Sequence, residues 1–327
     1  MHNLNISEIH DQLYSRRQKL QDAINSGNHV PQLVDLLQEV DSALERINLG
    51  SYGKCLVCHD PIETDRLAAD PLITVCLDHM NKSQQKFLEQ DLELASQIQN
   101  KLLPRNNFTE HGFEISYYYM PAGPVSGDYC DIVTAKNERE NLYFILGDIT
   151  GKGIAASMLV NHMYAMFHSL IELELPLNDL IKRANRLFCE SSLYTHFATM
   201  VCGVGDKNGD IEICNAGHCF PVLIKENEII SVNSTGLPIG LFCNLEYSVF
   251  NYHMNKGESL LIYSDGLSEA RRGEEEFGVE RINAIASSCY NLSSPEIIEL
   301  FIKKIIEFKD NSSSVDDMTM MVIKRIY

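Results

Sequence analysis

Four aspartates in this sequence lie beside short apolar runs, where a carboxylate could do metal chemistry. They are Asp128, Asp148, Asp265 and Asp316. Asp148 follows the unbroken apolar run 142–146 and begins a loop that carries Gly151 and Gly153. Such a run predicts a strand covered on both faces, and the glycines let backbone carbonyls come close to an ion. A turn in which Asp148 merely caps the next helix would give the same local pattern.

The repetition of this pattern favours the metal interpretation. Asp265 and Gly266 follow the apolar run 260–263, and Asp316 precedes the apolar run 320–323. No Cys or His lies among these acidic residues, and carboxylate oxygens are the ligands that Mg²⁺ and Mn²⁺ prefer. The sequence therefore predicts an oxygen-rich site for divalent ions, built from the ends of several strands.

A second set of metal-binding residue types lies nearer the N-terminus. The pair Cys55-x-x-Cys58 is followed by the pair Cys76-x-x-His79. Two chelating pairs with this spacing predict a tetrahedral structural zinc site. A single CxxC pair could be redox-active, but the second pair argues against that interpretation. His59 does not fit the spacing, and we expect it at the surface.

Helical periodicity describes most of the N-terminal third of the chain. Apolar residues recur at helical spacing in two segments between residues 7 and 48, which predicts an antiparallel helical hairpin. The segment from Lys82 to Leu103 has no glycine or proline and carries an apolar side made of Leu88, Leu92, Ala95, Ile98 and Leu102. This amphipathic helix either packs on its own domain or forms a short dimeric coiled coil. We favour the coiled coil, because two folded units flank the helix.

The remaining two thirds of the chain alternate strands with helices. The expected strands are 113–120, 129–135, 142–146, 198–205, 211–216, 220–225, 228–231, 245–252 and 259–264. The expected helices are 154–174, 177–193, 279–287 and 295–309. We expect an α+β fold with two mostly antiparallel sheets packed together and helices outside. The expected domains are 1–81, the linker helix 82–103, and 104–327.

Composition limits the classes of function. A formal charge of −18 over 327 residues argues against a general nucleic-acid surface, which needs clustered Lys and Arg. There is no signal peptide and no long apolar run typical of a membrane span. Ten cysteines would suggest disulfides in a secreted protein, but here a cytoplasmic protein with reduced thiols is the better interpretation.

Six blocks in the C-terminal part resemble a known family. They read PAGPVSGDYCD, GDITGKGIAASM, NAGHCFPVLI, GLPIGLF, YSDGLSEAR and SVDDMTMMVI. Their order and spacing are similar to those of the bacterial RsbU/SpoIIE-type protein phosphatases, which are metal-dependent serine/threonine phosphatases of the PPM superfamily. The resemblance covers about residues 104–327 and implies the α-β-β-α sandwich of that family.

The resemblance also implies roles for individual residues. Asp148 would bridge two Mn²⁺ or Mg²⁺ ions, and the carbonyl of Ile149 would contact one of them. Asp265 and Asp316 would hold the other ion, and Asp128 would bind directly or through water. The sequence does not tell whether Lys152 or His218 takes part in catalysis. The implied substrate is a phosphorylated anti-sigma-factor antagonist of the STAS type.

The segment around the Cys/His pairs resembles a different family. The run from Ala43 to Cys76 is similar to the DksA/TraR-type zinc fingers, which pack such a finger against a helical hairpin. Here the last ligand would be His79, where that family usually has cysteine. Several relatives bind RNA polymerase through acidic residues at the hairpin tip, but the tip at 27–31 carries none.

These observations predict a cytoplasmic, metal-dependent phosphoserine/phosphothreonine protein phosphatase with a zinc-binding regulatory module. We expect a homodimer, no direct nucleic-acid partner and no membrane span. The alternative is a regulator that binds the transcription machinery through its zinc module and uses the phosphatase domain as a sensor. A P-loop nucleotide binder, suggested by Gly151-Lys152-Gly153, is excluded because the GxxxxGK[ST] spacing is absent.

Overall fold

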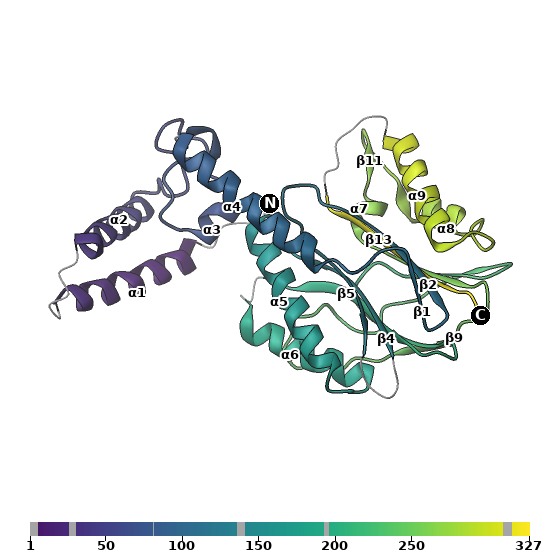
Figure 1. The fold of residues 1–327 in the computed structure, drawn as a ribbon. Coiled ribbons are helices and arrows are strands. Elements are labelled where there is room, and N and C mark those ends of the chain that lie inside the picture. The colour runs from purple at the N-terminus through teal and green to yellow at the C-terminus, as the bar shows by residue number, and fades with distance from the viewer. Residues whose placement is uncertain (1–5, 26–30, 81, 136–140, 193–195, 310–315) are drawn as a thin grey trace. The chain divides into compact units, whose positions relative to one another are not determined.

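The computed structural model describes residues 6–25, 31–80, 82–135, 141–192, 196–309 and 316–327 (Figure 1). The chain forms two compact units, residues 1–91 and residues 92–327, and the boundary falls within one helix.

The first unit begins with two helices that pack along each other, α1 (Ile6–Asn25) and α2 (Pro31–Asn48). Leu13 of α1 and Val40 and Ala43 of α2 are buried in their shared core. Arg17 of α1 donates a hydrogen bond to the Asp41 carboxylate of α2. The apolar periodicity thus forms the predicted pair of helices, while the predicted hairpin tip lies mostly outside the described residues.

A compact loop region follows α2 and carries the Cys/His pairs. It contains a short helix, α3 (Thr64–Ala69), and a single 3₁₀ turn, η1 (Leu77–His79). Tyr52, Ile62 and Leu67 are buried in the same core as the two helices. This core is small, so the region gains little stability from apolar burial alone.

The second unit contains a six-stranded sheet in which every neighbouring pair is antiparallel. The strand order is β1-β2-β13-β10-β7-β8. The strands are β1 (Phe108–Glu110), β2 (Phe113–Met120), β7 (Val222–Ile224), β8 (Ile229–Ser231), β10 (Ser259–Tyr263) and β13 (Met318–Arg325). The two central strands, β10 and β13, are buried along their whole length, as the unbroken apolar runs predict.

A five-stranded antiparallel sheet forms the second layer, with strand order β3-β4-β5-β6-β9. Its strands are β3 (Asp128–Thr134), β4 (Leu142–Ile149), β5 (Ala198–Gly205), β6 (Asp210–Ala216) and β9 (Phe250–His253). The inner faces of the two sheets pack together through buried side chains that include Phe113, Phe144, Leu146 and Leu260.

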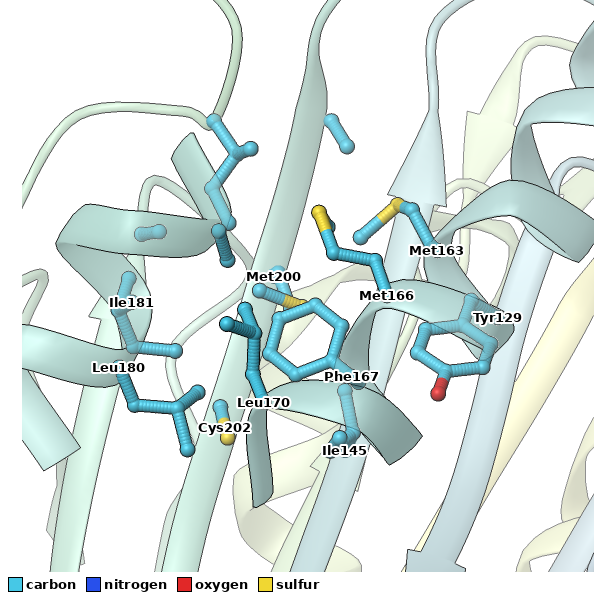
Figure 2. Close-up of a cluster of buried hydrophobic side chains, with 14 of the residues drawn as sticks. Tyr129, Ile145, Met163, Met166, Phe167, Leu170, Leu180, Ile181, Met200 and Cys202 are labelled. Carbon is cyan, nitrogen blue, oxygen red and sulfur yellow. The ribbon is translucent and has the colours of Figure 1, made fainter. Parts of the chain in front are cut away.

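Two helices, α5 (Ile154–Ile171) and α6 (Leu177–Ser191), cover the outer face of the five-stranded sheet. Figure 2 shows Phe167 and Leu170 of α5 packed over this sheet near Ile145 and Met200. By length and composition alone α5 could also cross a membrane, but it contributes seven buried apolar side chains to this core. Its apolar character is therefore explained by its place in the domain.

The outer face of the six-stranded sheet is covered by α8 (Gly278–Ala286) and α9 (Ser294–Lys309). Before them come the one-turn helix α7 (Asp265–Ser268) and a small hairpin of β11 (Arg271–Arg272) and β12 (Glu275–Glu276). The layers run helix, sheet, sheet, helix (Figure 1), which confirms the predicted α-β-β-α sandwich. The sequence patterns missed β1, α3 and the β11–β12 hairpin, which are too short to show periodicity.

The predicted linker helix is observed as α4 (Lys82–Leu102). Leu88, Leu92, Ala95 and Leu102 are half-buried, in agreement with the predicted apolar side. Ile98 departs from this expectation, because 45% of it is exposed, and its neighbour Leu94 is 57% exposed. Gln99 is buried instead.

Candidate metal centres

The four predicted aspartates come from the ends of strands in both sheets. Asp128 begins β3 and lies opposite Asp148, near the end of β4, in the antiparallel register. Asp265 begins α7 two residues after β10, and Asp316 lies two residues before β13. Because β10 and β13 are paired through Tyr263 and Met320, the ends that carry Asp265 and Asp316 adjoin each other. The structure thus brings two aspartates together in each sheet.

Asp128 is fully enclosed and is held by hydroxyl donors from the opposite sheet. Ser264 Oγ donates a hydrogen bond of 2.9 Å to Asp128 Oδ2, and Thr319 Oγ1 donates a second one to the same oxygen. Burial, followed by the charge of Asp148, raises the pKa of Asp128 well above its usual value. Sequence analysis did not find Ser264 and Thr319 as functional residues, although Ser264 directly precedes Asp265.

The other acidic groups also repel one another. Burial raises the pKa of Asp148 to about 7, and the charges of Asp265 and Asp316 add to the rise. The pKa of Asp265 is raised as well, first by burial and then by Glu269 and Asp316. Carboxylates that destabilise one another in this way create a strong negative potential, which a divalent cation would neutralise.

Asp316 and Asp317 play different structural parts. Lys152, from the loop after Asp148, lies 3.0 Å from Asp316 Oδ1. Asp317 instead accepts hydrogen bonds from the backbone N–H groups of Ala122, at 2.7 Å, and Gly127, at 2.8 Å. Asp317 therefore fixes the loop that leads to Asp128, and its carboxylate is directed at backbone.

Two glycines in the predicted motifs allow close approach of backbone at this site. A Cβ on Gly266 would lie 1.9 Å from the carbonyl oxygen of Asp317, so no side chain fits there. A Cβ on Gly127 would lie 3.1 Å from the carbonyl oxygen of Ile149, which is the predicted backbone ligand. Glycine at these positions keeps the acidic strand ends close together.

The buried Gln99 of α4 contacts the same loop. Its side-chain amide donates to the Ser126 carbonyl at 2.9 Å, and its Oε1 accepts from the Ser126 N–H at 3.0 Å. Ser126 Oγ in turn accepts from the Asp128 N–H at 3.0 Å. The helix before the domain is thereby joined to an aspartate of the site by three hydrogen bonds. No local pattern distinguishes Gln99 from the other amides of α4.

His218 lies buried beneath the site. Its Nδ1 is 2.8 Å from Thr199 Oγ1, and Thr199 is the cross-strand partner of Asp148. Its Nε2 has no hydrogen-bond partner, and burial lowers the pKa of the ring to about 4. The imidazole is therefore neutral at physiological pH, so it does not act as an imidazolium proton donor.

The predicted Cys/His group forms in the first unit. The ligand atoms of Cys55, Cys58, Cys76 and His79 all lie within 4.8 Å of one another. Cys76 Sγ lies 3.2 Å from His79 Nδ1 and 3.8 Å from Cys58 Sγ. His59 is exposed and lies outside this group, as expected. Three sulfurs and one imidazole nitrogen are the donor set of a structural zinc site.

The aspartates are spaced more widely than this group. Among the described residues, the Cys/His group alone brings three or more ligand atoms within 4.8 Å of one another. A site for two ions about 3.5–4 Å apart needs a wider arrangement of oxygens. The aspartate site offers carboxylate oxygens and one carbonyl oxygen, which suit Mg²⁺ or Mn²⁺. It lacks the sulfur and nitrogen donors with which the Cys/His group suits zinc.

Comparison with protein families agrees with this geometry. The family model described as Stage II sporulation protein E (SpoIIE) matches residues 138–326, more than half of the chain. The chain belongs to the SpoIIE family. The match contains β4, β10 and β13 and so includes Asp148, Asp265 and Asp316.

Individual relatives of this SpoIIE-family chain include named phosphatases. It is 24% identical over 244 residues to phosphoserine phosphatase RsbU of Bacillus subtilis (strain 168), covering 74% of this chain and 72% of that one. It is 28% identical over 270 residues to protein IcfG of Synechocystis sp., covering 72% of this chain and only 41% of IcfG. The expected enzyme class, a serine/threonine phosphatase, is confirmed by the similarity to phosphoserine phosphatase RsbU and by the match to the SpoIIE family.

Solved structures support the fold. The SiaA-PP2C domain of Pseudomonas aeruginosa superposes with a TM-score of 0.64 at 17% identity, covering 74% of this chain and 98% of that one. RsbX, crystallised in complex with magnesium, gives a TM-score of 0.50 at 14% identity, covering 66% of this chain and 97% of that one. At these identities the likeness concerns the fold, which is that of PP2C phosphatases.

Proposed function

We propose that this chain is a Mn²⁺- or Mg²⁺-dependent protein phosphatase that hydrolyses phosphoserine and phosphothreonine. One observation carries the proposal: the chain brings aspartates from four strand ends together and raises the pKa values of three of them. They are Asp128, Asp148 and Asp265. A fold gains nothing in stability from such repulsion, so a cation-binding role explains it best.

We assign the aspartates different roles at a two-ion site. Asp148 would bind both ions, and the carbonyl of Ile149 would serve as a ligand to one of them. Asp265 and Asp316 would hold the other ion, and Asp128 would bind directly or through a water. When bound, the ions would supply an acidified water and neutralise the phosphoryl oxygens.

The remaining groups position these ligands. Ser264 and Thr319 occupy one oxygen of Asp128 and so leave the other oxygen for a ligand or a water. Lys152 neutralises Asp316 and lies on a loop with an exposed side chain, from which it could reach a bound phosphate. His218 is buried and neutral, so we assign it a packing role and no proton transfer.

We further propose that the substrate is a phosphorylated STAS-domain protein. The similarity to phosphoserine phosphatase RsbU supports this choice. Incubation of the purified chain and Mn²⁺ with phosphorylated STAS proteins from the same cell tests it. We expect phosphate release from one of them and little from an unrelated phosphoserine protein. Equal rates on all substrates would contradict the substrate assignment and leave the phosphatase activity standing.

The first unit is proposed to bind one structural Zn²⁺ through Cys55, Cys58, Cys76 and His79. The resemblance to DksA/TraR-type fingers and the tight grouping of the four ligand atoms support this. The alternative role, binding RNA polymerase through the hairpin tip, would require acidic residues there, and residues 27–31 carry none. We therefore assign the zinc unit a regulatory role in a cytoplasmic phosphatase.

The linker helix α4 is proposed to pair with a second copy of this chain. Leu94 and Ile98 lie four residues apart on one helix face, and 57% and 45% of these residues are exposed. A second α4 helix would cover this face as in a short coiled coil. Because Gln99 of the same helix holds Ser126, pairing of α4 would adjust the loop before Asp128.

A further inference from the structure

Two cysteines outside both metal centres lie close together. Cys189 belongs to α6, and Cys243 follows the Gly236–Phe242 segment. Cys243 is exposed and Cys189 is partly exposed, whereas Cys130, Cys202, Cys214 and Cys289 are buried. Cys243 is therefore the most accessible thiol of the second unit.

The buried Asn185 fixes the relative position of α6 and this segment. Its Nδ2 donates to the Phe242 carbonyl at 2.9 Å, and its Oδ1 accepts from the Gly240 N–H at 2.8 Å. Cys189 lies one helical turn after Asn185 on the same face, and Cys243 is the next residue after Phe242. The hydrogen bonds of Asn185 to Gly240 and Phe242 thus place Cys189 and Cys243 near each other.

The two thiols lie close enough for Cys243 to affect the ionisation of Cys189. Burial, followed by hydrogen bonding to the Cys243 thiol, raises the pKa of Cys189 to about 12. Cys189 therefore stays protonated and is not the thiol that a peroxide oxidises first. Exposure makes Cys243 the thiol that meets an oxidant first.

We propose that Cys189 and Cys243 are a redox modification site, which a peroxide converts into a reversible disulfide. Cys243 loses its proton and attacks one peroxide oxygen, which gives a sulfenic acid and releases the first water. The Cys189 thiol then attacks the sulfenic sulfur, the S–O bond breaks, and the second water leaves with the thiol proton. In total, two thiols and one hydrogen peroxide give one disulfide and two waters.

The disulfide would fasten the Gly236–Phe242 segment to α6. This segment is already bonded to the sheet, since Ile239 and Ala198 exchange two backbone hydrogen bonds of 2.8 Å. Ala198 begins β5, whose next residue, Thr199, pairs with Asp148. A covalent link here would hold the border of the site in place and restrict the unfolded chain.

Peptide mapping of the full-length protein under non-reducing conditions tests the site. The protein is treated with a small excess of hydrogen peroxide, and Cys243→Ser, Cys189→Ser and Cys219→Ser are treated in parallel. We expect a linked peptide pair from α6 and residues around 243 in the wild type and in Cys219→Ser. The pair should vanish in the other two variants and on treatment with dithiothreitol. Cys243 oxidised to sulfinic acid, or linked to another cysteine, would overturn the proposal.

Thermal unfolding of the same samples tests the fastening. Oxidation should raise the unfolding midpoint of the second unit in the wild type relative to equally treated Cys243→Ser. If the linked peptide pair forms but oxidation does not raise the wild-type midpoint relative to Cys243→Ser, the disulfide does not stabilise the second unit and this part of the proposal is wrong.

Discussion

Asp128 and Asp148 are cross-strand partners at the end of the β3–β4 pair, so two carboxylates face each other in a buried setting. Neighbouring strands hold directly opposite side chains about 4.5–5.5 Å apart, where like charges destabilise the pair. Two hydroxyls from the other sheet, those of Ser264 and Thr319, stabilise one of these carboxylates. Repulsion between these two carboxylates raises the free energy of the folded protein when no cation is bound. The stability of the protein should therefore depend on pH, on mutation of either aspartate and on divalent ions.

The Asp148→Asn variant should lose activity while its metal-free form becomes more stable than the wild type. The folded pKa of Asp148 is raised to about 7 from an ordinary value of 3.8. A raised acid pKa favours the folded state below the unfolded pKa, and this contribution is lost as pH rises through the folded value. As the pH rises from about 4 to about 7, the unfolding midpoint temperature of the wild type should therefore decrease relative to that of the variant.

Thermal unfolding of zinc-loaded protein without Mn²⁺ or Mg²⁺ checks this. The exposed Glu299→Gln is the matched control, and its midpoint should follow the wild type across the same pH range. If Asp148→Asn also followed the wild type, the proposed repulsion at Asp148 would be wrong.

The Gln99→Ala variant should weaken activity from a position outside the catalytic site. The change leaves the N–H and carbonyl of Ser126 without their partners, which costs about 1–3 kcal/mol for buried groups. Loss of support behind a ligand typically lowers metal affinity or activity about 10–100-fold. Steady-state kinetics over a range of Mn²⁺ concentrations should show a higher Mn²⁺ requirement. Gln97→Ala, on the exposed side of α4, should behave as the wild type.

The double variant Leu94→Glu, Ile98→Glu should shift the chain toward a monomer. Charged side chains on the exposed apolar face of α4 would repel those of a second copy. Light scattering at several protein concentrations measures the mass. Glu93→Gln with Gln97→Glu changes exposed residues beside this face and is the control. If the Leu94/Ile98 variant had the same mass as the wild type, the proposed pairing of α4 helices would be wrong.

The Cys76→Ser variant should bind less than one zinc per chain and unfold its first unit. Metal binding supplies much of the folding free energy of small zinc modules, and this unit has a small core. Metal analysis and circular dichroism of the full chain measure both effects. His59→Ala, which removes an exposed histidine next to Cys58, should keep its zinc. Wild-type protein purified without chelators and free of zinc would refute the assignment.

The sequence predicted much of the fold because the central strands are unbroken apolar runs. β2 and β5 have the predicted bounds, and β10 and β13 are buried throughout. Edges were harder, since the strand expected at 245–252 is observed only as β9 (Phe250–His253). Short edge strands bury few residues, so propensity gives little signal there.

The aspartates were predictable because strand ends and glycines mark them, whereas their supporting residues were not. Ser264 and Thr319 lie 136 and 191 positions from Asp128 in the sequence, and Gln99 lies 27 positions from Ser126. No local pattern reports partners that only the fold brings together. Gln99 is a polar residue buried in this amphipathic helix, because its side-chain amide exchanges solvent for two backbone partners.

The most direct test of the account is phosphate release from a phosphoserine protein as Mn²⁺ is titrated into the full-length chain. The variants Asp128→Asn, Asp148→Asn, Asp265→Asn and Asp316→Asn are compared with the wild type and with Glu299→Gln. Metal ions supply several kcal/mol of transition-state stabilisation, so each aspartate variant should lose at least about 100-fold in rate. The wild type and Glu299→Gln should show the same Mn²⁺ dependence. Release that persists without divalent ions, or that survives in Asp148→Asn, would contradict the two-ion site.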